Sequence, residues 1–154
     1  MEHPTKVTFF SQRINKITTG ARHSLVIDEF NKVFSFGDNS EGQCTSGGTR
    51  IVNPTPIHFE SKDMIIDIFS GYSHCVLLTG IIKLNLANGE AYSWGDSMSG
   101  KLGYVDGVLA VRNPKAINIL KGKYISIISL GDQMTVVATT SSPSVKPSID
   151  VKIQ

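Results

Sequence analysis

The hydrophobic residues of this chain fall in short runs rather than in long stripes. Runs rich in Val, Ile, Phe and Ser are separated by clusters of Gly, Asp, Asn or Pro, which is typical of strands joined by tight turns. Within one stretch the pattern predicts four strands: His23 to Ile27, Lys32 to Phe36, Pro56 to Phe59 and Ile65 to Ser70. No convincing apolar stripe with a helical period extends over three turns, so almost no helix is expected.

The same pattern returns along the chain. KVFSFGDNSEGQ at residues 32–43 has a near-copy, EAYSWGDSMSGK, at residues 90–101. ITTGARHSLVI at residues 17–27 matches IFSGYSHCVLL at residues 68–78, and IISLGDQMTVVA at residues 127–138 is a looser third copy. The chain is therefore built from repeats of one unit.

Each copy holds a glycine, and the three glycines lie 51 and then 60 residues apart, at Gly20, Gly71 and Gly131. Nine additional residues in the second copy account for the longer interval, seven of them before Gly95 and two after Gly100. A period near fifty that consists of short β-rich runs indicates propeller blades, because solenoid repeats are usually shorter or helical. The predicted fold class is all-β, with four-stranded antiparallel sheets as blades.

The repeated phrases resemble a known family. Gly-x-x-His-Ser from Gly20 to Ser24, then VFSFGDNSEGQ and a strand led by proline, resembles the repeat of the regulator of chromosome condensation family. The second copy is closer, with Tyr-Ser-Trp-Gly at Tyr92 to Gly95. The resemblance covers roughly residues 4–140 and implies a propeller of about seven blades. The departures from the family pattern are Cys44 and Thr45 for Leu-Gly, Lys101 for Gln, and Met134 for His.

The number of repeats predicts an incomplete ring. The chain holds the end of one unit, two full units and the opening of a fourth, and about two to three blades cannot close. A fragment of a longer product, a truncated isoform, and a ring completed by another copy all fit, and the first two are favoured. We expect a repeat region at residues 1–140, with full units at about 20–70 and 71–130, and a polar tail or linker at 141–154.

Composition and charge narrow the function classes. Hydrophobic residues make up 40% and charged residues 18% of the chain, which is typical of a globular protein. The 15 basic and 13 acidic residues are spread along the chain, so no basic arm for nucleic acid is predicted. The N-terminal MEHPTK is not a signal peptide, and no apolar run is long enough to span a bilayer. Two cysteines without C-x-x-C spacing favour an intracellular address, cytoplasmic or nuclear.

The recurring residues are interpreted as structural. A catalytic base rarely recurs in every blade, whereas a hydrogen-bonding histidine that ties adjacent blades does, so His23 and His74 are assigned that role. Trp94 aligns with Phe36 and is expected in the core. The glycines supply positive φ or close backbone approach. The predicted structural repeat positions are Gly20, His23, Gly37, Gly42, Gly71, His74, Trp94, Gly95, Gly100 and Gly131.

When equivalent positions of the repeat are compared, the candidate catalytic pairs are better explained as structural residues. His74 and Cys75 are neighbours on a predicted strand, so their side chains point to opposite faces. Asp38 and Asp96 follow the turn glycines at equivalent points of separate blades, where an Asx-type turn accounts for them. The sequence therefore predicts no catalytic residue, no cofactor and no metal site.

We expect a non-catalytic module that binds a protein partner. The resemblance implies an alternative, guanine nucleotide exchange on a small GTPase of the Ran type. Family members with that activity use an enlarged loop after the aromatic-Gly, but Gly37 to Gly42 and Gly95 to Gly100 both have ordinary length. The weakly basic tail does not favour chromatin binding, and no membrane contact is expected. Open blade edges also predict self-association.

The seven additional residues, Gly80 to Leu86, form a candidate binding site. Without them, Asn88-Gly89 already completes a tight hairpin. The segment is then either a longer hairpin without consequence, a sequence artefact such as a translated intron, or a protruding apolar finger that binds a partner. The predicted partner-binding residues are Ile81, Ile82, Lys83, Leu84 and Leu86.

Overall fold

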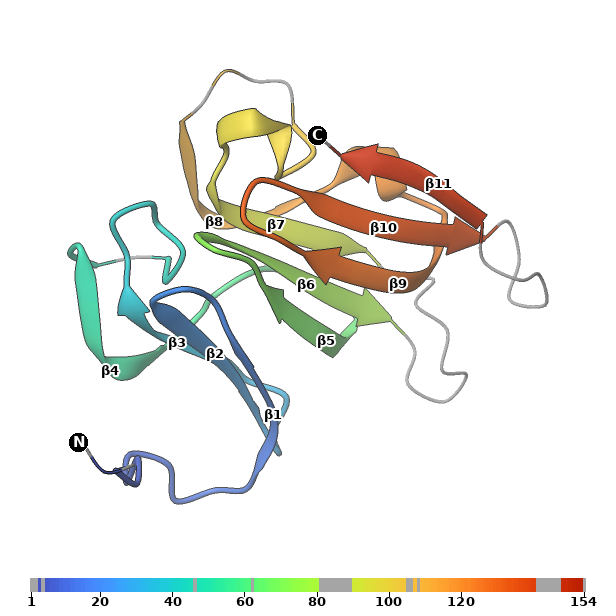
Figure 1. The fold of residues 1–154 in the computed structure, drawn as a ribbon. Helices are drawn as coiled ribbons and strands as arrows, with labels where there is room; N and C mark the ends of the chain where they lie inside the picture. Colours follow the sequence, from blue (N-terminus) through green and yellow to red (C-terminus); the bar gives the residue numbers. More distant parts are fainter. Residues whose placement is uncertain are drawn as a thin grey trace.

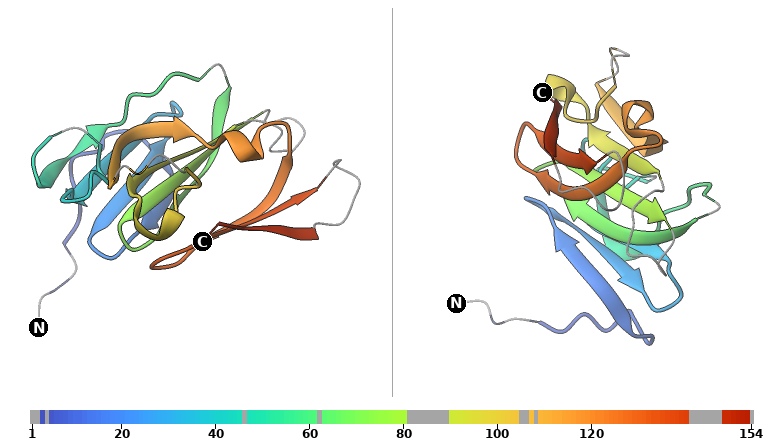
Figure 2. Two further views of the ribbon diagram at one scale, coloured as in Figure 1. Left: turned by 90° about the horizontal axis from the view of Figure 1, so that it is seen from above. Right: turned by 90° about the vertical axis from the view of Figure 1, so that its right-hand side faces the viewer.

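The chain folds into a row of antiparallel sheets. The computed structural model describes residues 3, 5–45, 47–61, 63–80, 90–104, 107 and 109–140, and the backbone of 148–153. Figure 1 shows three sheets, which we call the first, middle and third sheets in chain order. The middle sheet lies between the other two, and Figure 2 shows the same row from two further sides.

The first sheet has the order β1-β2-β3-β4 and the middle sheet the order β5-β6-β7-β8. Their strands are β1 (Ile14–Thr19), β2 (His23–Asp28), β3 (Val33–Asp38), β4 (Arg50–Pro56), β5 (Met64–Ser70), β6 (His74–Gly80), β7 (Ala91–Asp96) and β8 (Ala110–Ala116). The third sheet has the order β11-β10-β9, with β9 (Tyr124–Leu130), β10 (Thr135–Thr140) and β11 (Ser148–Ile153). Two single turns of 3-10 helix, η2 (Met98–Gly100) and η3 (Asn118–Leu120), lie between strands.

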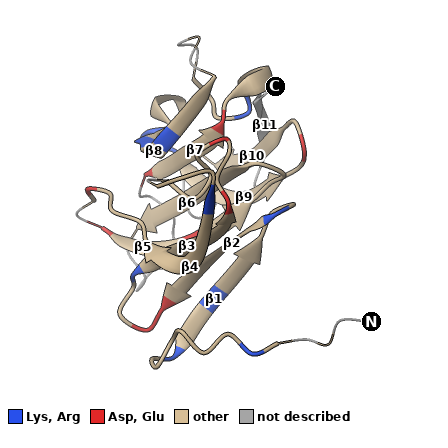
Figure 3. Ribbon diagram, turned by 90° about the vertical axis from the view of Figure 1, so that its left-hand side faces the viewer, with Lys and Arg blue, Asp and Glu red and all other residues tan. Residues whose placement is uncertain are grey.

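The predicted fold class is confirmed: the chain is all-β, and its sheets form an open row rather than a closed ring. Basic and acidic residues are interspersed over the sheets in the described part of the chain (Figure 3). The same part contains no helix that is long and apolar enough to cross a membrane.

One of the predicted strands is wrong, and another is correct but belongs to a different sheet than its repeat unit implies. The strand expected at Pro56 to Phe59 is instead β4, which ends at Pro56. Two residues beyond Pro56 are apolar because they pack: Ile57 is buried, and the ring of Phe59 lies 5.4 Å from that of Tyr92. The strand at Ile65 to Ser70 exists, but as β5 it opens the middle sheet rather than closing the first. Each four-stranded sheet thus begins one strand before the Gly-x-x-His turn.

Strand β11 lies inside the segment that the sequence assigns to a polar tail. It pairs antiparallel with β10, for example Val137 with Val151. The division of the chain into a repeat region and a tail stays a prediction.

The core consists of two seams between neighbouring sheets. Alternate residues of β6 face opposite ways: Cys75 and Leu77 lie in the seam with the first sheet, and Val76 and Leu78 in the seam with the third. All seven residues of β6 are buried. The middle sheet is therefore covered on both faces, which explains why β6 holds an uninterrupted apolar run from Cys75 to Leu78 instead of alternating.

The outer face of the first sheet has no such cover. Ile17, Ile68 and Ile128 occupy the same position of the repeat, three residues before its glycine. Ile68 is 2% exposed and Ile128 8%, because each packs in a seam, but Ile17 is 62% exposed. The same side chain is core or surface according to whether a sheet lies beside it.

The edge strands β4 and β8 of the first and middle sheets carry prolines. Ile57 N–H donates to Val33 O and Ile117 N–H to Ala91 O, both at 2.8 Å, so these residues face the neighbouring strand. By alternation, Pro54, Pro56 and Pro114 lie at positions that face away from the sheet. Proline has no N–H to offer there, so addition of a further strand at these edges is disfavoured.

Ile68 and Ile17 offer a matched test of the seams. We expect Ile68→Ala to lower the free energy of unfolding by about 2–5 kcal/mol, the usual cost of a cavity in a closed core. Ile17→Ala, with the same chemical change on an exposed side chain, should change it by less than about 0.5 kcal/mol. Urea unfolding followed by Trp94 fluorescence gives both values, and equal losses would contradict the seam assignment.

Candidate functional site

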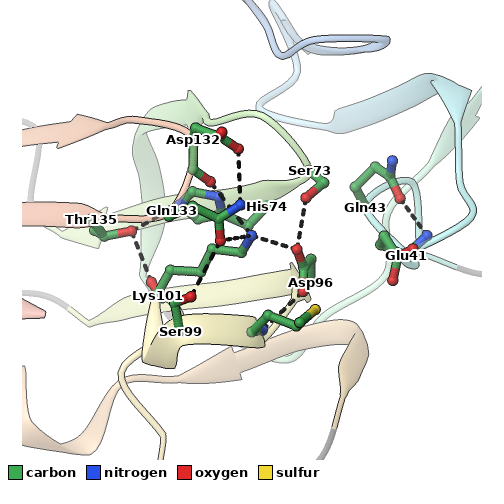
Figure 4. Close-up of polar contacts among 11 residues, drawn as sticks. Glu41, Gln43, Ser73, His74, Asp96, Ser99, Lys101, Asp132, Gln133 and Thr135 are labelled. Atoms are coloured by element: carbon green, nitrogen blue, oxygen red, sulfur yellow. Dashed lines mark hydrogen bonds and ion pairs between the residues drawn. The ribbon is translucent and has the colours of Figure 1, made fainter. Parts of the chain in front are cut away.

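A short hydrogen-bond chain crosses the seam between the middle and third sheets. His74 Nε2 lies 2.9 Å from Thr135 Oγ1, and Thr135 Oγ1 donates to the carbonyl oxygen of Lys101 at 2.8 Å (Figure 4). Because the hydroxyl gives its only proton to the carbonyl, it must accept from His74. His74 therefore carries its proton on Nε2.

The same arrangement of hydrogen bonds crosses the seam between the first and middle sheets. His23 Nε2 lies 3.1 Å from Cys75 Sγ, and Cys75 Sγ donates to the carbonyl oxygen of Gln43 at 3.6 Å. Trp94 Nε1 donates to that carbonyl at 2.9 Å. We call the arrangement the seam relay: a histidine of one sheet, a hydroxyl or thiol of the next sheet, and a carbonyl of the residue after the loop glycine.

The turn glycines let the sheets approach closely. A Cβ on Gly20 would lie 2.4 Å from the carbonyl oxygen of Gly71, and a Cβ on Gly71 would lie 2.7 Å from that of Gly131. Ala21 N–H donates to Tyr72 O, and Tyr72 N–H to Gly131 O, each at 3.2 Å. Only glycine leaves room for this backbone contact. The other predicted turn glycines have positive φ: Gly37 (113°), Gly42 (79°), Gly95 (101°) and Gly100 (69°).

Both relay histidines are neutral at pH 7. Burial lowers the pKa of His23 and of His74 to about 4, and Lys101 also lowers that of His74. The Nδ1 atom of each ring is buried without a hydrogen-bond partner, so a proton added there would have no acceptor. These histidines are held in place by the seam and are poorly suited to exchange protons.

The cysteines are equally unreactive. Both are free and buried. Burial raises the pKa of Cys75 well above its ordinary value and raises that of Cys44 to about 12. Since the thiolate is the nucleophile, neither thiol is activated. No group of three or more His, Cys, Asp or Glu residues that could hold a metal ion occurs among the described residues.

A buried ion pair lies at the seam between the middle and third sheets. Lys101 is buried, pairs with Asp96, and reaches the carbonyl oxygen of Asp132 and Oε1 of Gln133 in the third sheet, each at 3.5 Å. Burial opposes ionisation of Asp96, but hydrogen bonds from Lys101 and from the N–H of Met98 outweigh it and hold the pKa of Asp96 below its usual value. The carboxylate thus stays ionised and tied to the seam.

In the first sheet a hydrogen bond from a glutamine to an aspartate takes the equivalent place. Gln43 Nε2 donates to Asp38 Oδ2 at 3.0 Å. Lys101, which replaces the glutamine in the second copy, adds a charge whose contacts extend to the neighbouring sheet. Asp38 and Asp96, equivalent in the repeat, both accept bonds within their own loops: Ser40 N–H at 3.4 Å and Met98 N–H at 2.9 Å.

Three apolar side chains are exposed at one end of the middle sheet. Tyr72 lies in the turn from β5 to β6, Met98 follows β7, and Leu109 precedes β8. They are 55%, 61% and 76% exposed. The segments are joined by backbone bonds, from Asp96 N–H to Ser73 O at 3.0 Å and from Ser97 N–H to Leu109 O at 3.1 Å. We call Tyr72, Met98 and Leu109 the apolar end patch.

The apolar end patch is specific to one copy of the repeat. The equivalent residues of the first sheet are Ala21, Ser40 and Thr49, which are small or polar. The fold therefore does not require large apolar side chains at these positions. Tyr72 also borders a hollow of about 190 Å³ where the turns of the three sheets meet. Sequence reasoning missed the patch, although a comparison of equivalent positions between copies would have found it.

The predicted partner-binding residues Ile81, Ile82, Lys83, Leu84 and Leu86 lie outside the described residues. The flanking residues Gly80 and Glu90 are described and lie at the end of the middle sheet opposite to the apolar end patch. The assignment of this segment to partner binding stays a prediction.

Comparison with known proteins gives a consistent result. A model of the regulator of chromosome condensation (RCC1) repeat matches residues 31–78 and 88–138, and a second model of that repeat matches residues 14–43. The chain is similar to the E3 ubiquitin-protein ligase HERC2 of Homo sapiens, with 27% identity over 131 residues that cover 84% of this chain and 2% of HERC2.

Two further similarities involve smaller proteins. The secretion-regulating guanine nucleotide exchange factor of Bos taurus is 30% identical over 129 residues, which cover 83% of this chain and 26% of that protein. The crystal structure of Prp20p from Saccharomyces cerevisiae has a similar fold, with a TM-score of 0.69 and 24% identity over 86% of this chain and 30% of that one. The chain thus spans at most 30% of the length of these three proteins.

The seam relay is tested by removing its histidine. We expect His74→Ala to lower the free energy of unfolding by about 1–3 kcal/mol, because Thr135 loses a buried hydrogen-bond partner. Met134→Ala is the matched control, since Met134 occupies the same repeat position on an uncovered face. Urea midpoints measure both, and an unchanged midpoint for His74→Ala would contradict the structural role.

The histidines also predict how stability depends on pH. An unfolded histidine binds a proton below about 6.5, whereas folded His23 and His74 do so only below about 4. Between these values the unfolded state binds more protons, so the free energy of unfolding should fall as the pH is lowered from 6.5 to 4. His74→Gln, which does not titrate, should flatten this part of the profile. A profile unaffected by the substitution would contradict the assignment.

Proposed function

This chain belongs to the regulator of chromosome condensation (RCC1) repeat family, and on that premise we propose that it is a non-catalytic module for protein–protein interaction. Similar proteins bind other proteins: yeast RCC1 (Prp20) forms a complex with Kap60, and Prp20p has binding properties to Gsp1p and histones. HERC2, of which the matched region is a small part, is an E3 ubiquitin-protein ligase. These similarities support a module that recognises other proteins.

One observation carries the proposal: the histidine and thiol side chains of the repeat form hydrogen bonds inside the seams. His23, His74 and Cys75 lie in the seam relays with their pKa values shifted away from catalysis. The apolar end patch, in contrast, faces solvent on loops that the sheets hold in place. Exposed apolar residues on loops held by a rigid framework are typical of protein contact sites.

The apolar end patch has the composition of an interface centre. Tyr72 and Met98 belong to residue types that are enriched at protein interfaces, and a tyrosine loses little conformational entropy on binding. Leu109 adds exposed apolar surface at the same end of the sheet. A second proposed contact remains the set of sequence-predicted residues Ile81, Ile82, Lys83, Leu84 and Leu86.

Guanine nucleotide exchange on a Ran-type small GTPase is the second candidate. The similarity to the secretion-regulating guanine nucleotide exchange factor supports it. The segments from β3 to β4 and from β7 to β8 run from residues 39 to 49 and from 97 to 109. They differ by only two residues, so neither copy carries a much larger insertion at this place.

The apolar end patch is tested by Tyr72→Ala. We expect this variant to lose about thirtyfold or more in affinity for partners captured by the wild-type chain, because an aromatic anchor is typically worth about 2 kcal/mol or more. Stability should be unchanged, since Tyr72 is exposed. Val52→Ala, which truncates an exposed apolar residue of β4, is the control. Partners retained equally by Tyr72→Ala and Val52→Ala would contradict the proposed site.

An exchange assay separates the two candidate functions. A Ran-type GTPase loaded with fluorescent GDP should release its nucleotide at the same rate with and without the chain if the chain is a binding module only. Accelerated release would establish the exchange activity instead.

A further inference from the structure

We infer that a hollow beside the linker from the first to the middle sheet binds a small molecule that combines an apolar body with a carboxylate, and that Lys32 and His58 receive the carboxylate. The hollow lies at the hairpin from β2 to β3, at the end of the sheets opposite to the apolar end patch. The inference therefore concerns a different place and does not depend on the proposed function.

The hollow has the size and lining of a small-molecule site. Its volume is about 380 Å³, and pockets for small molecules begin at about 300 Å³. Its apolar walls come from β3, from the linker after β4 and from β5, and include Val33, Phe34, Ile57, Phe59 and Ile65. Such pockets are mostly apolar, and a few polar groups fix the orientation of the ligand.

Two polar side chains of the lining are available to a ligand. Asn31 is not, because its Nδ2 donates to Ile65 O at 2.9 Å and its Oδ1 accepts from Ile65 N–H at 2.8 Å. Lys32 and His58 are exposed, and their side chains make no hydrogen bond or ion pair within the described part of the chain. No aspartate or glutamate occurs among the described residues that line the hollow. An ammonium group and an imidazole N–H are donors, so they fit an anionic acceptor such as a carboxylate.

The same place in the middle sheet is nearly closed. The backbone shows the equivalence, since Ile57 N–H donates to Val33 O as Ile117 N–H does to Ala91 O. Around Ala91 and Ile117 the remaining space is only about 10 Å³. The repeat as such therefore does not require the hollow.

One side chain accounts for the difference between the two copies. The segments 57–65 and 117–125 have the same length, so Glu60 is equivalent to Leu120. Leu120 is 1% exposed and packs with Ile117 in the seam between the middle and third sheets. Glu60 is exposed instead. The first linker thus has no apolar side chain at the Leu120 position, and the hollow stays open.

Acidic residues gather on the other side of Phe59. Glu60, Asp63 and Glu90 line a neighbouring hollow that shares Phe59 with the first one. The two hollows therefore differ in the sign of their charge. Only the hollow beside Lys32 suits an anion.

Two probes with the same apolar body and opposite charges test the inference. Phenylbutyrate and phenylbutylamine are titrated into the isotope-labelled full chain, and binding is followed by the backbone amide shifts of Lys32, Val33 and His58 in nuclear magnetic resonance spectra. We expect saturable shifts with phenylbutyrate at these residues. Phenylbutyrate should bind about fivefold more tightly than the amine, the upper range for one exposed ion pair.

Lys32→Glu tests the charge at the rim of the hollow. The second copy has Glu90 at this position, so the fold accepts the residue. The variant should bind phenylbutyrate about fivefold more weakly than the wild type. Lys121→Glu is the matched control, because Lys121 is exposed, borders the nearly closed space of the middle sheet and changes the net charge equally.

Unchanged thermal unfolding shows that both variants are folded, and Lys121→Glu should bind phenylbutyrate as the wild type does. The inference is overturned by an absence of saturable shifts at Lys32, Val33 and His58, by equal affinities for the two probes, or by equal losses in the two variants.

Discussion

The close approach of neighbouring sheets is the constraint on which this protein depends. The turn glycines let the backbone of one sheet touch that of the next, with the carbonyl of Gly71 at 2.4 Å from where a Cβ of Gly20 would lie. That approach buries polar groups, and buried polar groups need partners. The seam relay supplies them twice with the same geometry. A histidine, a hydroxyl or thiol and a carbonyl thus hold together elements that are more than fifty residues apart.

The seams also explain why the most reactive residue types of the chain are inert. Burial makes the histidines poor bases and the thiols poor nucleophiles, and the same burial lets the relay bonds stabilise the fold. Lys101 shows how a seam tolerates change. It replaces a neutral glutamine, yet Asp96 and the third sheet satisfy its charge, so a substitution in the repeat becomes an additional contact between sheets.

In a repeat of this kind, the positions that hold the sheets together differ from the positions that can vary to bind a partner. Positions that form the seams must stay similar, while positions at the ends of the sheets are free to vary. The contrast between Tyr72 and Ala21 illustrates this freedom, because both occupy the same turn and only one is a large apolar residue. Thr45 shows the limit of such variation: it has a φ of 67° where the second copy has Gly103 at 79°. A β-branched residue is disfavoured in that region, so this departure costs stability.

The sequence by itself determined the all-β class, the repeat and the equivalence of its positions, because turn chemistry and short-range alternation are local properties. It also predicted that His23 and His74 bond across blades, but could not name Cys75 and Thr135 as the partners. Tertiary structure decided what depends on neighbours. The segment after Pro56 is a packed linker and not a strand, since Phe59 contacts Tyr92 from the next sheet. Ile17 and Ile68 are identical in the repeat, yet only the adjacent sheet makes one of them core. Burial is a property of the surroundings, and the surroundings are set by contacts far apart in the chain.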